Sequence, residues 1–174
     1  MESYVINARR TLHEYPEIGF ELDRTLAFLK SELDKMGVEN TDKYGKSSLV
    51  ATINPEKTKF TIGIRADIDA LPIVEKTGLP YACKGGNMHA CGHDFHAAML
   101  LGAAKLLKEE EATLGGCVRL LFQPAEEILE GAKDCIESGV LKGVDAALMI
   151  HVLTAFNSTM VGVIVSSEGV SAPA

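Results

Sequence analysis

The segment NMHACGHDFHAAMLLGAAKLL (residues 87–107) joins a cluster of polar side chains to a strongly helical pattern. Its first half contains three histidines, a cysteine and an aspartate. Its second half has residues at steps of four and three on one stripe: His93, Ala97, Leu100, Ala104 and Leu107. Such a stripe is typical of a helix that packs on a core. Since His93 begins the stripe, its ring is predicted to lie at a helix start, over the edge of the core.

The side chains of this segment are those that bind transition metals. Imidazole, thiolate and carboxylate groups are the usual ligands of zinc and its neighbours. The chain adds two adjacent carboxylates and a histidine at the end of an apolar run, so the candidates are His89, Cys91, His93, Glu126, Glu127 and His151. Four of the five histidines, His89, His93, His96 and His151, fall in this segment or at the end of that run. The leading hypothesis is therefore a metal site.

Length and composition set limits on the class of protein. A chain of 174 residues, 47% hydrophobic and 24% charged, is typical of one globular domain. The net charge of −7 argues against a nucleic-acid binder, which needs a basic face to neutralise phosphates. The amino-terminal residues MESYVINARRTLHEYPE lack the apolar core of a signal peptide, and no apolar run reaches bilayer length. We expect a cytoplasmic protein with no membrane partner.

The four cysteines form no CxxC pair. In a reducing compartment they are expected to remain thiols. Cys117 and Cys135 are predicted to be small core residues, and Cys83 is more simply explained by packing than by ligation. Only Cys91 is assigned a function.

The rest of the chain alternates helical and extended patterns. A helix is predicted over residues 3–15, ended by Pro16, and a second on the stripe of Leu22, Leu26, Leu29, Leu33 and Met36, ended by Gly37. Strands are predicted over residues 48–53, 60–65 and 117–122, with a buried strand over 146–150 and a short helix over 132–138. The fold class is α/β, with a largely parallel or mixed central sheet flanked by helices.

Polar residues follow three of these strands. Asp67 and Asp69 follow the strand 60–65, Glu126 and Glu127 follow 117–122, and His151 follows 146–150. Taken singly, the aspartates could be turn residues, the glutamates a solvated pair, and the histidine bound to a carbonyl. Because open α/β sheets bind ligands at the carboxyl ends of strands, the joint arrangement favours one site.

The adjacent glutamates suit a division of labour. One can ligate a metal while the other takes a proton from water and delivers it to the leaving group. A bound metal lowers the pKa of water from about 15.7 towards 7, which makes a carboxylate an adequate base. The pair therefore predicts hydrolysis.

Five segments together resemble a known family: RRTLHEYPEIGFE (9–21), RADIDALPIVEKTGLPY (65–81), the segment 87–107, LLFQPAEE (120–127) and GAKDCIESGVL (131–141). The chain is similar to the two-metal aminoacylases and carboxypeptidases that cleave amide bonds. Within them it most resembles the amidohydrolase branch, with hippurate hydrolases, N-acyl-amino-acid deacylases, N-acetyldiaminopimelate deacetylases and plant auxin-conjugate hydrolases. The resemblance implies a zinc-exopeptidase-like fold.

The resemblance also implies a metal site and its ligands. Two divalent ions (zinc, manganese, cobalt or nickel) would share the thiolate of Cys91, with His93, Glu127 and His151 as further ligands. Glu126 corresponds to the general base, and Asp67 to a carboxylate that orients a ligand. His13 is expected to be structural, and His89 and His96 to be hydrogen-bonded framework residues.

The same resemblance implies a substrate and partners. The expected reaction is metal-dependent hydrolysis of the amide bond of an N-acyl amino acid or peptide. Enzymes of this type are longer than this chain. They are expected to form homo-oligomers through a lid and dimerisation domain. They also carry another metal-binding histidine near the carboxyl terminus. Residues 1–174 are thus expected to be the amino-terminal part of a truncated catalytic domain, whose activity needs the missing segment.

Two alternatives remain open. The chain could be a catalytically inactive, metal-binding fragment of such an enzyme. Cys91 could also act as a covalent nucleophile with His93 as its base. The spacing of only two residues makes good geometry between that nucleophile and that base difficult.

Overall fold

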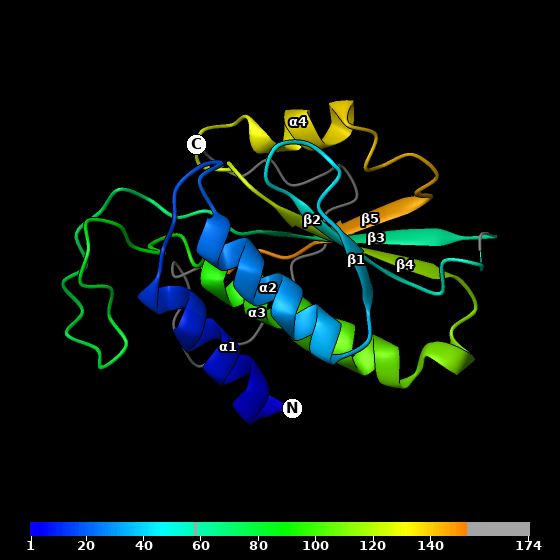
Figure 1. Cartoon of the computed structure of the whole chain (residues 1–174), viewed down its shortest axis with the longest axis horizontal. Coiled ribbons are helices and arrows are strands. Elements are labelled where there is room, and N and C mark those ends of the chain that lie inside the picture. The colour runs from blue at the N-terminus through cyan, green and yellow to red at the C-terminus, as the bar shows by residue number, and fades with distance from the viewer. Residues whose placement is uncertain (58, 153–174) are drawn as a thin grey trace.

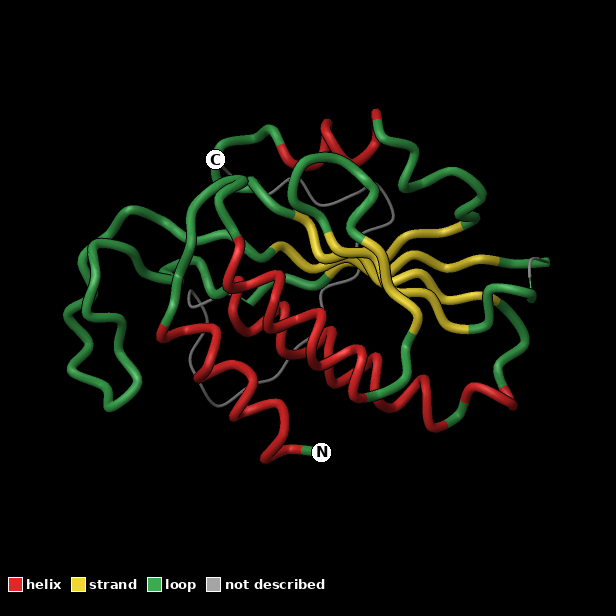
Figure 2. Tube along the Cα trace, in the orientation of Figure 1, coloured by secondary structure: helices red, strands yellow, loops and turns green. Residues whose placement is uncertain are grey.

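Five strands form one sheet in the computed structural model, which describes residues 1–57 and 59–152 (Figures 1 and 2). The strands are β1 (Glu39–Thr41), β2 (Leu49–Ile53), β3 (Thr61–Asp67), β4 (Cys117–Gln123) and β5 (Ala146–Met149). The helices in the same residues are α1 (Glu2–Glu14), α2 (Asp23–Lys35), α3 (His93–Glu109) and α4 (Gly131–Glu137), with a 3-10 turn at Glu111–Thr113. The α/β prediction is confirmed.

The sheet is mixed and has the order β1-β2-β4-β3-β5. β3 pairs in parallel with both β4 and β5, whereas β2 pairs antiparallel with β4 and with β1. Of the two predicted arrangements, the mixed sheet is therefore the correct one. Because β3, β4 and β5 are parallel, their carboxyl ends lie at the same edge of the sheet.

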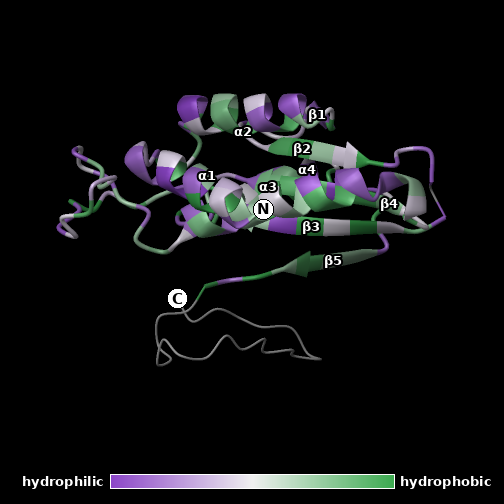
Figure 3. Ribbon diagram, turned by 90° about the horizontal axis from the view of Figure 1, so that it is seen from below, coloured by the Kyte–Doolittle hydropathy of each residue, from purple (hydrophilic) through white to green (hydrophobic). Residues whose placement is uncertain are grey.

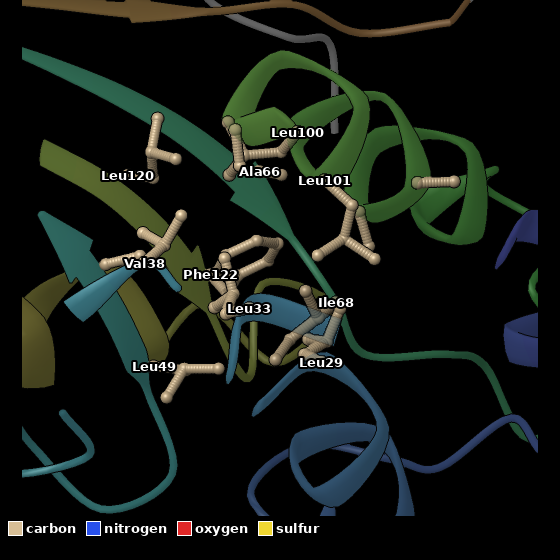
Figure 4. Packing of buried hydrophobic residues seen from close by; sticks show 14 of the residues in the cluster. Leu29, Leu33, Val38, Leu49, Ala66, Ile68, Leu100, Leu101, Leu120 and Phe122 are labelled. Carbon is tan, nitrogen blue, oxygen red and sulfur yellow. The ribbon is translucent and has the colours of Figure 1, made fainter. Parts of the chain in front are cut away.

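Helices α1, α2 and α3 cover one face of the sheet, and α4 lies on the other (Figures 1 and 3). The main core lies between the sheet and the first three helices. It includes Leu29 and Leu33 of α2 and Leu120 and Phe122 of β4, all fully buried (Figure 4). Each large aliphatic side chain buried in this way contributes about 1.5–3 kcal/mol. The predicted stripe of α2 is confirmed.

A smaller cluster lies under α4, where Cys135 packs with Val140 against Val50 of β2 and Leu121 of β4. Cys135 and Cys117 are both buried thiols, as predicted. Burial is the main reason that the pKa of Cys135 rises to about 11. Both cysteines are packing residues.

Two features differ from the prediction. β1 has only three residues, Glu39, Asn40 and Thr41, and their polar character gives no strand pattern to recognise. The strand at β5 is predicted to be buried, but all four of its residues are exposed. It is the last strand of the sheet in the described part of the chain, and α4 packs over β2 and β4 instead. Among the described helices, none has the length and apolar character to span a bilayer.

Candidate metal centre

His93, the first residue of α3, is oriented by a backbone carbonyl. Its Nδ1 donates to the oxygen of Asp69 at 2.9 Å, so Nε2 is the ring nitrogen whose lone pair the neutral imidazole can offer to a metal. Nε2 is buried and has no hydrogen-bond partner among the described residues. It faces carboxylate oxygens of Asp67 (3.5 Å), Glu126 (3.8 Å) and Glu127 (3.8 Å). The lone pair is thus aimed at a group of anions.

The two glutamates are held by Asp69 as well. The carboxylate of Asp69 accepts the backbone N–H of Glu126 at 3.0 Å and that of Glu127 at 3.1 Å. Their side chains remain partly accessible, with exposed fractions of 32% and 17%. Asp69 therefore joins the loop after β4 to the start of α3.

The loop after β4 is also fixed by its own backbone. Ala125 and Leu129 have positive φ angles of 53° and 59°, the left-handed region that costs an L-residue about 1–2 kcal/mol. The amide of Ala125 donates to the carbonyl of Gly19, and that of Gly131 donates to the carbonyl of Ala125. A Cβ at Gly131 would lie 1.6 Å from the carbonyl oxygen of Pro124, so only glycine fits there. The turn presents both glutamates in one defined geometry.

Cys91 and His151 complete the cluster. Sγ of Cys91 lies 3.5 Å from Nε2 of His151, and Nδ1 of His151 donates to the carbonyl of Val152 at 2.7 Å. One ligand atom each of Cys91, His93 and Glu127 lie within 4.8 Å of one another. A second overlapping group, within the same limit, contains Asp67, His93, His96 and His151.

These separations fit ligands of a transition metal. Metal–ligand bonds of about 2.0–2.3 Å at tetrahedral angles place two ligand atoms roughly 3.3–3.8 Å apart. The distance from Cys91 Sγ to His151 Nε2 is 3.5 Å, and that from His93 Nε2 to Glu127 Oε1 is 3.8 Å. Glu127 Oε1, like His93 Nε2, is buried with no hydrogen-bond partner among the described residues. Two facing acceptors without a donor are the arrangement that a cation satisfies.

The pKa shifts in the cluster also indicate a site for a cation. Burial lowers the pKa of His93, but the carboxylate of Asp69, 3.5 Å from Nδ1, and the carboxylates of Asp67 and Glu127 outweigh burial and raise it. Burial raises the pKa of Glu127, and the neighbouring carboxylates of Glu126 and Asp69 add to the effect. Burial, followed by the carboxylates of Glu127, Asp67 and Glu126, raises the pKa of Cys91 to about 11. The site favours positive charge.

The raised pKa of Cys91 also bears on its possible use as a nucleophile. A catalytic cysteine needs a thiolate near neutral pH, which a positive environment provides. Here the thiol has carboxylates around it, and Nδ1 of His93 is bound to Asp69. The geometry therefore favours ligation over covalent catalysis.

Asp67 forms its hydrogen bonds with His96 and Arg65 and not with His93. One of its oxygens lies 2.5 Å from Nδ1 of His96, and the other accepts from Arg65 at 2.8 Å. Burial opposes its ionisation, but the bond to His96 and the charges of His93 and Arg65 hold its pKa at about 2. Asp67 is thus a buried anion at the centre of a hydrogen-bonded chain.

The structure brings every predicted site residue to one place: Asp67, Cys91, His93, Glu126, Glu127 and His151. The sequence points to Asp69 only through its position after a strand. It does not reveal that Asp69 binds the His93 ring through its backbone oxygen and the Glu126 and Glu127 amides through its side chain. Its spacing of two residues from Asp67 was the available signal, since residues at that spacing lie on the same side of an extended chain.

The remaining histidines differ in their surroundings. His13 bonds to Asp94 at 2.7 Å and to Glu75 at 3.1 Å, as a framework residue would. The expectation that His89 is hydrogen-bonded was wrong: both ring nitrogens are buried without a partner among the described residues. Burial lowers the pKa of His89 to about 4, which leaves the ring neutral.

The sequence is similar to those of known proteins. The chain is 53% identical over 152 residues to an N-acetyl-L-cysteine deacetylase of Bacillus subtilis, with 87% of the chain covered. It is 46% identical over 150 residues to the IAA-amino acid hydrolase ILR1-like 5 of Arabidopsis thaliana, with 86% covered. The chain spans about a third of the length of these relatives, 36% and 34%.

Solved structures agree with the fold. One from Bacillus subtilis, described as a dinuclear metal binding peptidase of the M20 family, matches with a TM-score of 0.82 and 47% identity. The match covers 86% of this chain and 42% of the other. The model of peptidase family M20/M25/M40 matches residues 63–166, which include most of β3, the start of α3, the glutamate loop and His151. More than half of the sequence, with all the residues of the cluster, thus follows this pattern, and the chain belongs to peptidase family M20/M25/M40.

Proposed function

We propose that this chain contributes the site for metal-dependent hydrolysis of the amide bond of N-acyl amino acids. The observation that carries the proposal is the pair of buried, unpartnered acceptors, His93 Nε2 and Glu127 Oε1, which face each other at 3.8 Å within the described residues. The names of two relatives, an N-acetyl-L-cysteine deacetylase and an IAA-amino acid hydrolase, support the class of substrate.

The donor set supports two divalent cations. Cys91, His93, Glu127 and His151 would hold them, with Cys91 lying close to members of both ligand groups. Four carboxylates, those of Asp67, Asp69, Glu126 and Glu127, supply the compensating charge. Thiolate, imidazole and carboxylate together suit zinc, manganese, cobalt or nickel. Such ions supply Lewis acidity, which polarises an amide carbonyl and makes water a stronger acid.

Glu126 is the proposed general base. Its carboxylate lies 3.8 Å from His93 Nε2 and is the more exposed of the two glutamates, so water and substrate can reach it. It would accept a proton from the attacking water and return it to the amide nitrogen as the bond breaks. The bond from its amide to Asp69 holds its backbone still, so the carboxylate needs no large movement.

The test is release of free amino acid from N-acyl amino acids by the chain loaded with zinc or manganese. Glu126→Gln keeps the proposed ligands and removes the base, so the rate should fall by about 10²–10⁴-fold with metal content unchanged. Glu130→Gln, at an exposed glutamate at the end of the same loop, serves as the matched control. Equal, measurable rates in the Glu126 and Glu130 variants would refute the role of Glu126.

A second function, metal binding without turnover, uses the same donors. It would be supported if the loaded chain held two ions but released no amino acid from any N-acyl substrate. In that case the ligand assignment stands and hydrolysis by residues 1–174 alone fails.

A further inference from the structure

The segment that carries His151 docks on the start of α3. It follows the edge strand β5, and the side chain of His151 is exposed. The main-chain N–H of Val152 donates to Nε2 of His96 at 2.9 Å. This bond crosses 56 residues of sequence and joins the residue next to His151 to the first turn of α3.

A close packing contact occurs at the same point. Gly92 precedes α3 with a φ of +87°, and a Cβ built on it would lie 2.5 Å from Cγ2 of Val152. The absence of a side chain at Gly92 therefore lets Val152 approach the helix. The hydrogen bond and the packing contact independently place this segment.

The hydrogen bonds of His96 also define which tautomer the ring adopts. Since Nε2 accepts from Val152, Nδ1 carries the proton and donates it to Asp67. Asp67 in turn accepts from Arg65 at 2.8 Å. Both nitrogens of His96 are thus engaged, and the ring is almost completely buried, with 3% exposed. Although His96 lies near the ligand atoms, it has no free lone pair for a cation.

We propose that His96 is a positioning residue for His151, and that its ring, held by Asp67, fixes the main chain at Val152 so that the His151 imidazole stays beside Cys91. The inference rests on the metal site of the proposed function but does not require turnover. Partners that orient metal ligands typically alter metal affinity by about 10–100-fold when removed.

Two substitutions separate the bonds of His96. The side-chain amide introduced by His96→Asn reaches about as far as Nδ1, so it keeps a donor for Asp67 and loses the acceptor for Val152. The longer amide introduced by His96→Gln reaches about as far as Nε2 and keeps an acceptor for Val152. The Asn variant should therefore disturb His151, and the Gln variant should disturb it much less.

The experiment is a Co²⁺ titration of the 174-residue chain, followed by the absorption that thiolate ligation produces. His96→Asn should weaken binding of the cation that His151 holds by about 10–100-fold, with a smaller loss in His96→Gln. In the His151→Ala background, adding His96→Asn should cause no further loss, because the residue it positions is gone. Equal losses in the Asn and Gln variants, or an undiminished loss in the His151→Ala background, would overturn the proposal.

A measurement without metal keeps the inference separate from the proposed function. Nuclear magnetic resonance of the metal-free chain should show coupling across the hydrogen bond between the Val152 amide nitrogen and His96 Nε2. The ring signals of His151 should move in His96→Asn and stay in place in His96→Gln. If no cation binds but these signals behave as expected, the metal site fails and the positioning role stands. Absence of the coupling in the unsubstituted chain refutes the positioning role, whether or not the variants fold.

Discussion

Asp69 and His93 meet in one hydrogen bond, from Nδ1 of the ring to the backbone oxygen of the aspartate at 2.9 Å. The side chain of the same aspartate accepts the amides of Glu126 and Glu127. One residue therefore sets the direction of the histidine lone pair and the place of both glutamates. The three groups of the proposed centre keep their relative positions through this shared support.

Replacing Asp69 should cost stability, because two backbone amides would lose their acceptor. An unsatisfied buried donor costs about 1–3 kcal/mol, so Asp69→Ala should lower the free energy of unfolding by at least this amount. Asp69→Asn retains one side-chain oxygen and should cost less. Urea denaturation measures both. Asp42→Ala, at an exposed loop position, is the control, and a loss no larger than in that control would contradict the support assigned to Asp69.

Cys91→Ser should change which metal the centre prefers. A hydroxyl is a harder and weaker ligand than a thiolate, so affinity for zinc and cobalt should fall far more than affinity for manganese. Competition with a chelator measures each affinity. Cys83→Ser should leave all affinities unchanged, and a uniform loss for the three metals in Cys91→Ser would argue against direct ligation.

Gly92→Ala and Gly78→Ala form a matched pair. Both glycines have positive φ angles, +87° and +70°, so alanine at either should cost about 1–2 kcal/mol in backbone strain. A Cβ at Gly78 meets nothing within 4 Å, whereas one at Gly92 collides with Val152. Gly92→Ala should therefore lose more stability and also weaken metal binding. Thermal denaturation and metal titration test this, and equal effects of the two variants would count against the docking of Val152.

His13 should make stability depend on pH. Its hydrogen bond to Asp94 is the main cause of its raised pKa, with burial opposing and Glu75 adding to the rise. A raised pKa in the folded state contributes stability that is complete below the unfolded value, about 6.5, and is lost as pH rises through the folded value. His13→Gln should therefore cost more stability at about pH 6 than at about pH 9. Denaturant titrations of both proteins at the two pH values decide this, and a difference independent of pH would show that the histidine acts only by packing.

Much of the fold could be predicted from local patterns. The stripe from Leu22 to Met36 predicts a helix ended by Gly37, and α2 ends at Lys35, with Gly37 at a φ of +67°. The strand predicted over residues 117–122 is found as β4. The exposure of β5 could not be read from its apolar sequence, because exposure depends on which strands the helices cover. That arrangement is set by the packing of the whole sheet.

The site was predictable to a similar extent. The rule that ligands gather at the carboxyl ends of strands predicts from the sequence alone that Asp67, Glu126 and His151 lie together. The supporting bonds were not predictable, since Asp69 meets Glu126 across 57 residues and His13 meets Asp94 across 81. Such contacts carry no local pattern, and a buried histidine such as His89 looks the same in sequence whether or not it has a partner.

The left-handed turn after β4 has a thermodynamic consequence for ligand binding. Ala125 and Leu129 occupy an unfavourable backbone region, and the rest of the protein forces them to remain there. The glutamate loop therefore loses its conformational entropy during folding, before any ligand binds. A cation or substrate then meets a pre-organised loop, and little of its binding free energy is consumed in ordering Glu126 and Glu127.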